Sequence, residues 1–324
     1  MDKQINISVC IPVYNGEETI TRAIESVLKQ TYKPLEIIVC DNASTDKTEQ
    51  IVKPYILKGI KYYRNNNNIG MYGNWNKCIE LSRGDWIYLL HDDDEMLPNM
   101  LLDVCQSISK YNNENIGMIF GKVHVFDDTI GKQLVINYPF NDDILLDKYE
   151  LIKYISKGNF IYCPGVLVSK KIYDNGLRFV DNFLIDYIMW VNINKIAKVL
   201  FINKLIANYH LNNDSLTITG GEKNFIDSIK AIEGLQKDKE LLPYFDNFNS
   251  YIKSNYIGLS SYYFKRGEKL KSKTALSHAK SIKNNCLKRI ILKLEIAMLI
   301  QFISHKLALK FLNHNFHFKK IDKS

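Results

Sequence analysis

The sequence predicts an α/β fold in which a mostly parallel sheet carries helices on both faces, with a helical extension at the C-terminal end. The first observation is that short apolar runs alternate with segments of helical spacing through residues 5–90. The second is that residues 222–283 show a helical pattern. The length of 324 residues is long for one hydrophobic core and favours one large domain with an appendage.

The first strand is expected at residues 5–13, where the run INISVCIPV ends in the polar stretch YNGEE. A helix is expected from Ile20, because its apolar residues recur at the spacing of one helix face. These residues are Ile20, Ala23, Ile24, Val27 and Leu28. Strand and helix together predict a first β–α unit.

A second unit of the same kind follows. The strand LEIIVC, at residues 35–40, stops at Asp41. The next helix is expected to open with Asp46 and Glu49, which stand at capping-box spacing. Its apolar face would be formed by Ile51, Val52, Tyr55 and Ile56.

The third strand, IKYYR at residues 60–64, leads into an asparagine-rich loop at 65–68. A helix is expected over WNKCIEL, residues 75–81, and Gly84 ends it. The fourth strand is DWIYLL at residues 85–90. This alternation of strand and helix predicts parallel pairing.

Polar residues follow these strands at the carboxyl ends, where sheets of this kind bind ligands. Tyr14 and Asn15 come after the first strand, Asp41 after the second, and Asp92–Asp94 after the fourth. Adjacent carboxylates repel one another, so a cation would stabilise the cluster. Oxygen ligands suit Mg²⁺ or Mn²⁺, and no glycine-rich phosphate loop is present. We therefore expect a divalent cation that holds a phosphate-bearing ligand.

Composition bears on compartment and partners. The six cysteines include no Cys-x-x-Cys pair, which predicts reduced thiols in a reducing compartment. Neither a signal peptide nor an uninterrupted run of about 18 apolar residues is seen, so we expect a cytoplasmic protein without a membrane-spanning helix. Residues 265–324 carry 15 Lys and Arg against three acidic residues, a net charge of +12; the chain total of +8 leaves −4 for residues 1–264.

Four segments together resemble the inverting nucleotide-sugar glycosyltransferases of family two, which have the Rossmann-like GT-A fold. They are IPVYNGEETI, IIVCDNASTDKT, the stretch from NNIG to DEMLP, and FLIDYIMW. The resemblance covers about residues 5–215. It implies a GT-A domain at residues 1–220, with a nucleotide-binding half at about 1–125 and an acceptor half at about 126–220. A basic helical region at 221–324 would follow.

The resemblance implies a nucleotide pocket. Asp41 would accept a hydrogen bond from the base, which favours UDP- or dTDP-sugars over CMP-sugars and leaves GDP-sugars open. Pro12 and Tyr14 would line the pocket, Asn68 would approach the nucleotide from its loop, and Asp92 would bind the ribose or a metal-bound water.

The resemblance also implies a metal and a base. Asp93 ends the family's Asp-x-Asp motif and would bind Mn²⁺ or Mg²⁺; the first position is His91, and whether His91 or Asp92 assists stays open. His210 would add a metal ligand. Asp186 would deprotonate the acceptor as general base. A further departure is Trp75, which stands where the family often has Arg; the alternatives are that Lys77 or Arg83 takes its place or that the metal alone suffices.

The predicted function is metal-dependent transfer of a sugar from a UDP-sugar to a glycan or lipid-linked acceptor in surface polysaccharide synthesis. The helix expected at residues 287–312 is basic and apolar, which suits packing on the protein, a homo-oligomer interface, or the inner face of an anionic membrane. A dTDP- or GDP-sugar donor is the main alternative. A sugar nucleotidyltransferase or a nucleic-acid-binding module is less well supported, because neither a triphosphate loop nor a nucleic-acid-reading motif is present.

Overall fold

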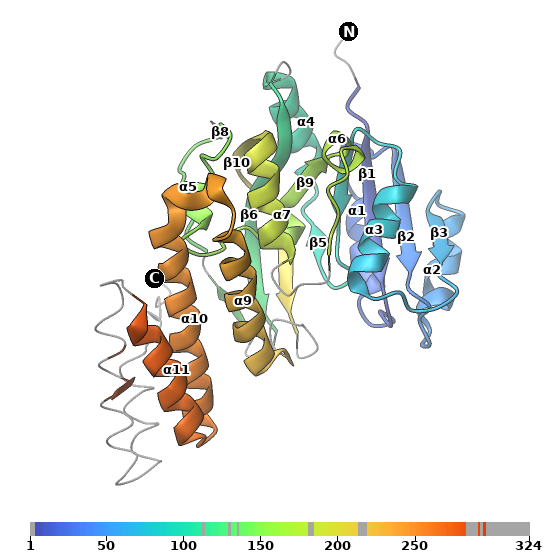
Figure 1. Cartoon of the computed structure of the whole chain (residues 1–324). Coiled ribbons are helices and arrows are strands. Elements are labelled where there is room, and N and C mark those ends of the chain that lie inside the picture. The colour runs from blue at the N-terminus through green and yellow to red at the C-terminus, as the bar shows by residue number, and fades with distance from the viewer. Residues whose placement is uncertain are drawn as a thin grey trace, which may run out of the picture. The chain divides into compact units, whose positions relative to one another are not determined.

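The structure of the chain is a computed structural model, shown in Figure 1. It describes residues 4–111, 114–128, 131–134, 136–180, 185–212, 219–282, 291 and 294–295. The chain divides into two compact units, residues 1–218 and 219–324.

The first unit is built on a mixed sheet, which in the described part of the chain has the order β3-β2-β1-β4-β9-β6-β10-β5. Its first four strands are parallel: β1 (Ile7–Val13), β2 (Glu36–Asp41), β3 (Lys61–Arg64) and β4 (Trp86–Leu89). β9 (Val166–Ser169) lies antiparallel between β4 and β6 (Ile116–Asp127), and β6 is parallel to β10 (Lys198–Leu211). The short strands at the margins are β5 (Glu95–Met96), β7 (Lys132–Leu134) and β8 (Ile144–Leu146).

Helices connect these strands. They are α1 (Ile20–Leu28), α2 (Thr48–Ile56), α3 (Met71–Leu81), α4 (Met100–Lys110), α5 (Ile152–Ile155), α6 (Lys170–Asp174) and α7 (Ile185–Ile196). A 3₁₀ turn at Cys163–Gly165 precedes β9. The expected strands and helices of residues 5–90 are therefore present, and the predicted α/β class with a mostly parallel sheet is confirmed.

Two local expectations were wrong. The third helix begins at Met71, four residues before the start that its apolar pattern indicated, because Gly70 adopts a positive φ of 78° and ends the loop. The capping box of α2 does not form. Asp46 accepts a hydrogen bond from the Thr48 N–H at 3.0 Å, but Glu49 turns outward to Lys53 at 3.0 Å.

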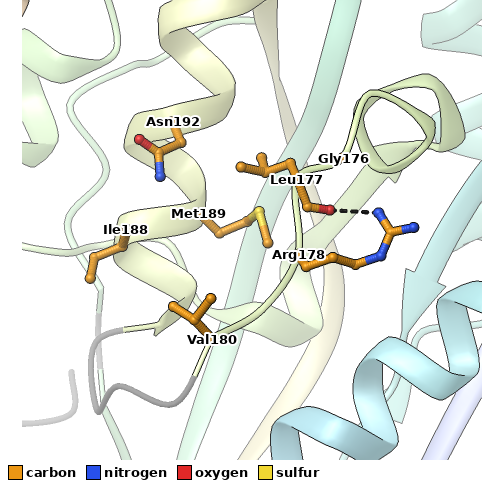
Figure 2. Close-up of a pocket in the computed structure, with 7 residues that line it drawn as sticks. All are labelled: Gly176, Leu177, Arg178, Val180, Ile188, Met189 and Asn192. Atoms are coloured by element: carbon orange, nitrogen blue, oxygen red, sulfur yellow. Dashed lines mark hydrogen bonds between the residues drawn. The ribbon is translucent and has the colours of Figure 1, made fainter.

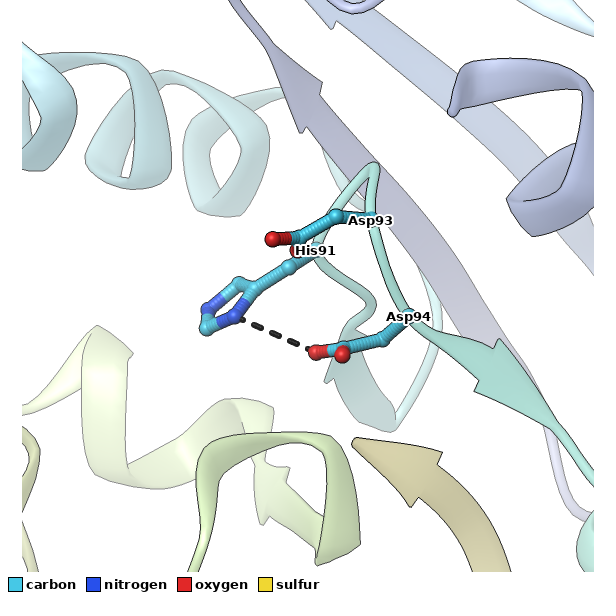
Figure 3. Close-up of side chains that lie close together, drawn as sticks. All are labelled: His91, Asp93 and Asp94. Atoms are coloured by element: carbon cyan, nitrogen blue, oxygen red, sulfur yellow. Dashed lines mark ion pairs between the residues drawn. The ribbon is translucent and has the colours of Figure 1, made fainter. Parts of the chain in front are cut away.

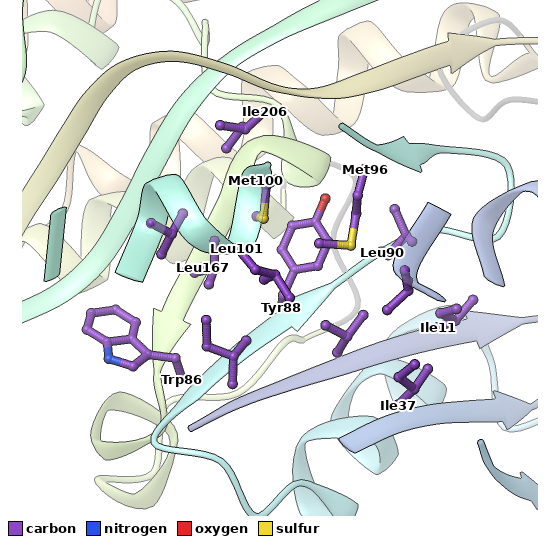
Figure 4. Close-up of a cluster of buried hydrophobic side chains, with 14 of the residues drawn as sticks. Ile11, Ile37, Trp86, Tyr88, Leu90, Met96, Met100, Leu101, Leu167 and Ile206 are labelled. Carbon is purple, nitrogen blue, oxygen red and sulfur yellow. The ribbon is translucent and has the colours of Figure 1, made fainter. Parts of the chain in front are cut away.

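Strand β1 is buried on both faces, as expected for a central parallel strand. Ile7, Val9 and Ile11 belong to a large apolar cluster that also takes side chains from α1, α2 and α4. Figure 4 shows part of this cluster around Tyr88, whose hydroxyl donates a hydrogen bond to the Pro164 carbonyl at 2.6 Å. Cys10 points to the opposite face, where its Sγ lies 3.1 Å from Ser82 Oγ beside α3. Helices therefore cover both faces of the sheet.

The second unit is helical where the structure describes it. It contains α9 (Gly221–Leu235), a 3₁₀ helix (Lys239–Tyr244), α10 (Phe245–Lys265) and α11 (Lys269–Ser281). The basic helix expected at 287–312 lies outside the described residues except for Ile291, Leu294 and Glu295. The first two of these side chains are buried. Across the described residues of the whole chain, no helix has the length and apolar character needed to span a bilayer.

One buried carboxylate joins three strands at the amino end of the sheet. Glu36 accepts hydrogen bonds from Ser8 Oγ at 2.7 Å, from Lys61 Nζ at 2.6 Å, and from the backbone and side-chain N–H groups of Arg83 at 2.7 and 3.2 Å. Burial raises the pKa of Glu36, but these donors outweigh burial and lower the pKa to about 2. The ionised form therefore stabilises the fold above the unfolded pKa, and this contribution is lost as the pH falls from about 4.5 toward 2.

We expect Glu36→Gln to lower the free energy of unfolding at pH 7 by about 1–3 kcal/mol, because Lys61 and Arg83 lose a buried, charge-assisted acceptor. Denaturant titration at pH 7 and pH 3.5 measures the effect, and the difference from the wild type should shrink at the lower pH. The control is Glu80→Gln, which removes an exposed pair with Lys77 (3.3 Å) and should change stability by less than about 0.5 kcal/mol. Equal effects of the two substitutions would contradict this account.

Candidate active site

The loops after β1 and β2 are tied together at the carboxyl edge of the sheet. Pro12 lies within β1, is buried and pairs with Cys40, whereas Tyr14 is 48% exposed just beyond the strand. Asn15 donates its backbone N–H to Ser44 Oγ at 2.9 Å, and its side-chain oxygen accepts the Thr45 N–H at 2.8 Å. The predicted pocket residues Pro12 and Tyr14 therefore stand beside the end of β2.

Asp41 ends β2 and is fully buried. Its carboxylate accepts hydrogen bonds from the Ser44 N–H at 2.7 Å, the Tyr62 hydroxyl at 2.5 Å and Arg64 Nη1 at 2.6 Å. Burial and the Asp41 carboxylate both raise the pKa of Tyr62. Sequence reasoning missed Tyr62 and Arg64, although their place on the neighbouring strand KYYR was a usable signal: Arg64 pairs in register with Asp41.

Asn68 belongs to a network of amides that shapes the loop before α3. Its side-chain oxygen accepts the Asn42 Nδ2 hydrogen at 2.8 Å and the Gly70 N–H at 2.8 Å. Asn42 in turn accepts from Asn65 Nδ2 at 3.0 Å and from the Ile69 N–H at 3.0 Å. The structure thus places Asn68 next to the segment that follows Asp41, and it also gives Asn68 a role in fixing the loop.

The acidic turn after β4 packs closely against the loop after β1. Asp92 Oδ2 accepts from Thr19 Oγ1 at 3.4 Å, and a side chain at Gly16 would overlap the same oxygen. Burial, followed by the charge of Asp93, raises the pKa of Asp92 to about 7. Arg22, which sequence reasoning also missed, donates to the Asp93 carbonyl and holds the turn from α1.

Three potential metal ligands gather at this turn. One ligand atom each from His91, Asp93 and Asp94 lies within 4.8 Å of the other two (Figure 3). Asp94 is fully buried, and its Oδ2 has no hydrogen-bond donor among the described residues. A buried carboxylate oxygen without a hydrogen-bond donor is costly, and a cation at this point would compensate it. The donor set therefore fits a divalent ion.

The imidazole of His210 does not belong to this group of three. The His210 backbone N–H donates to Asp94 Oδ1 at 2.9 Å, which places β10 directly against the acidic turn. The ring of His210 stacks on Phe126, with its Nδ1 3.1 Å from Asp128 Oδ2 and its Nε2 4.0 Å from Glu95 Oε1. Asn212, the next polar residue, donates to Asp93 Oδ2 at 3.0 Å.

Asp186 lies in the first turn of α7. Its Oδ1 accepts the Tyr187 N–H at 2.7 Å. Burial raises the pKa of Asp186 to about 6, while the nearby charge of His91 acts in the opposite direction. The structure therefore brings Asp186 into the electrostatic field of the acidic turn, with a pKa suited to exchanging a proton near neutral pH.

A pocket of about 270 Å³ lies between α7 and the segment of residues 176–180 (Figure 2). Its lining is mainly apolar, with Arg178 at one side; the residues are Gly176, Leu177, Arg178, Val180, Ile188, Met189 and Asn192. Arg178 Nη1 donates to the Leu177 carbonyl at 2.8 Å. The pocket and Asp186 share one helix.

The expectation that Arg83 serves the site is wrong. Arg83 binds Glu36 at the amino end of β2, whereas Asp41 lies at the carboxyl end of the same strand. Lys77 pairs with Glu80 at 3.3 Å. Trp75, which departs from the family pattern, stacks instead on His91 with ring centroids 4.9 Å apart.

The chain matches relatives of known type. It is 28% identical over 307 residues, 90% of this chain and 93% of the relative, to a Campylobacter jejuni protein named GalNAc(5)-diNAcBac-PP-undecaprenol beta-1,3-glucosyltransferase. It is 29% identical over 213 residues, 65% and 79% of the two chains, to the Escherichia coli UDP-Glc:alpha-D-GlcNAc-diphosphoundecaprenol beta-1,3-glucosyltransferase WfgD. Two further curated relatives, from Mycobacterium tuberculosis and Rickettsia typhi, are matched over only 38% and 66% of their own length.

The fold has solved counterparts. Staphylococcus aureus TarS 1–349 in complex with UDP-GlcNAc superposes with a TM-score of 0.63 at 16% identity, covering 97% of this chain and 93% of that one. The model of the family described as "Glycosyl transferase family 2" matches residues 8–169, the segment that contains the strand ends and the acidic turn. The chain therefore belongs to glycosyl transferase family 2.

Proposed function

We propose that this glycosyltransferase moves a sugar from a UDP-sugar, with Mn²⁺ or Mg²⁺, to a hydroxyl of a lipid-linked or glycan acceptor in surface polysaccharide assembly. The observation that carries the proposal is the convergence at one sheet edge of a buried acid at the end of β2, a candidate metal centre and an acid of raised pKa. These are Asp41, the group of His91, Asp93 and Asp94, and Asp186.

The donor side is supported by the contacts of Asp41. Three hydrogen bonds hold its carboxylate in place, and an ionised carboxylate has about four acceptor positions, so we propose that the fourth accepts a base N–H. Uracil offers such an N–H, and WfgD carries UDP-Glc in its name. Thymine and guanine also offer one, so dTDP- and GDP-sugars are the alternatives that a donor screen must compare.

The proposed reaction is a single in-line displacement with inversion. Asp186 accepts the proton of the acceptor hydroxyl, the hydroxyl oxygen forms a bond to the anomeric carbon, and the bond from that carbon to the nucleoside diphosphate breaks. The electron pair of the broken bond leaves with the diphosphate. A divalent ion held by Asp93 would neutralise charge on the diphosphate. Asp92 would bind the ribose, while Arg22 keeps the backbone of the acidic turn in place.

The acceptor side is supported by relatives and by the position of the pocket on α7. Both relatives act, by name, on sugars linked through a diphosphate to undecaprenol. A lipid-linked acceptor would bring the protein to the inner face of a membrane, where the excess of Lys and Arg in residues 265–324 favours anionic lipid. Buried Ile291 and Leu294 indicate that at least part of the helix expected at 287–312 packs on protein instead.

Asp93→Asn should abolish metal-dependent UDP binding and leave the fold intact, because the side chain is a strand-end ligand outside the apolar core. Calorimetric titration of UDP with and without Mn²⁺ measures this. The matched control is Asp103→Asn on α4, whose carboxylate faces Lys204 at 3.9 Å and should be neutral for binding. Unchanged Mn²⁺-dependent UDP binding in Asp93→Asn would refute the metal assignment.

Asp41→Asn should weaken UDP by about 10- to 150-fold, since it removes a charge-assisted acceptor worth roughly 1.5–3 kcal/mol. Binding of pyrophosphate with Mn²⁺ should change little, because the phosphates lie with the metal. Thermal unfolding of the variant reports the separate cost of removing the ion pair of Asp41 with Arg64. Equal losses for UDP and pyrophosphate would show that Asp41 serves only the fold.

Asp186→Asn should reduce sugar transfer by about 10²–10⁴-fold and spare UDP-sugar affinity, because the amide cannot accept a proton. The exposed Asp174, which pairs with Lys170 at 2.8 Å, provides the control Asp174→Asn. In the wild type, kcat/KM should fall as the pH drops through about 6, where Asp186 becomes protonated. A rate within a few-fold of the wild type in Asp186→Asn would rule this residue out as the base.

A further inference from the structure

The position where the family motif has its first aspartate carries a nitrogen donor in this chain. Glycosyl transferase family 2 membership makes a carboxylate-bound metal the expectation, and the inference below rests on the metal-dependent function proposed above. His91 follows β4 directly, and one of its ring nitrogens lies within 4.8 Å of ligand oxygens of both Asp93 and Asp94.

Packing fixes the plane of the His91 ring. The indole of Trp75 is 6% exposed and stacks on the imidazole with an interplanar angle of 24°. Tyr72 and Phe179 contact the indole edge-on, with ring centroids 5.8 and 5.0 Å away. Trp75, which stands where the family often has arginine, therefore restricts the plane of the His91 ring.

The two partners face each other without a close hydrogen bond. His91 Nδ1 lies 3.4 Å from Asp94 Oδ2, longer than the usual range of about 2.7–3.2 Å for an N–H···O bond. Asp94 cannot swing away easily, because its other oxygen accepts the His210 backbone N–H at 2.9 Å. Its Oδ2 is buried, without a hydrogen-bond donor in the described part of the chain, and points toward His91 (Figure 3).

This spacing, which the structure shows as an ion pair, also suits two ligands on one ion. Ligand atoms about 2.2 Å from a metal are separated by about 3.1 Å at a right angle and about 4.4 Å when opposite. His91 Nδ1 and Asp94 Oδ2 are 3.4 Å apart, and the ligand atoms of His91, Asp93 and Asp94 all lie within 4.8 Å of one another. The side chains would have to move only slightly closer together to reach these ligand separations.

We propose that His91 Nδ1 is a ligand of the divalent ion, so that the centre has one imidazole and the carboxylates of Asp93 and Asp94. The consequence is metal selectivity. Mg²⁺ binds oxygen ligands, whereas an imidazole donor raises the affinity of later first-row ions such as Co²⁺. The preference of this chain for Co²⁺ over Mg²⁺ should therefore be larger than that of a variant with aspartate at position 91.

Electron spin-echo envelope modulation of Mn²⁺ bound to the full chain tests the ligand directly. The wild type should show coupling to one ¹⁴N nucleus, and protein labelled with [¹⁵N]histidine should show ¹⁵N coupling in its place. His91→Asp should lose the nitrogen signal while Mn²⁺ still binds. His210→Asn should retain it. Absence of nitrogen coupling in the wild type, or its loss in His210→Asn alone, would overturn the proposal.

Competition titrations with Co²⁺ and Mg²⁺ test the selectivity. His91→Asp should reduce the ratio of the Mg²⁺ to the Co²⁺ dissociation constant by about tenfold or more; an unchanged ratio would contradict an imidazole ligand. Should His91→Asp fail to fold, the labelled wild type still decides the question. If Mn²⁺ binds neither alone nor with UDP, the metal dependence of the proposed function fails as well. Binding without nitrogen coupling refutes only the role of His91.

Discussion

The geometry of the site depends on one buried carboxylate, Asp94. Asp94 directly precedes β5. It accepts a hydrogen bond from the backbone N–H of His210 on β10 and faces His91, which follows β4. Burying a charge is costly unless it is paired, so the turn and β10 must meet at this point. Residues more than a hundred positions apart in the chain are thereby held at one place.

The crowding of the acids Asp92–Asp94 favours a cation at this turn. Burial and mutual repulsion raise the pKa of Asp92 to about 7, which indicates that the turn is electrostatically strained when no cation is near. Arg22 on α1 and Asn212, just after β10, donate hydrogen bonds to the Asp93 backbone and side chain and so hold the turn in this conformation. A divalent ion would relieve the same repulsion, which supports the proposed metal dependence.

Strand β2 carries a buried acid at each end, and strand β3 supplies a cation to each. Glu36 pairs with Lys61 and Asp41 pairs with Arg64, both at 2.6 Å. The two pairs have different surroundings. Glu36 accepts four hydrogen bonds at the amino end and serves stability, whereas Asp41 faces the edge where ligands bind. An acid–cation pair therefore stabilises the fold at the amino end of the sheet, and a similar pair is proposed to bind the nucleotide at the carboxyl end.

Sequence alone determined the alternation of strands and helices, because apolar spacing such as that of Ile20, Ile24 and Val27 reports local burial directly. It also identified the strand-end acids, since parallel strands place their carboxyl ends at one edge. Tertiary structure alone decided which side chains meet. The salt bridge of Arg64 with Asp41, the stacking of Trp75 on His91 and the contact of Asp94 with β10 join segments whose separation no local pattern encodes. These contacts depend on strand register and helix packing, which only the assembled fold defines.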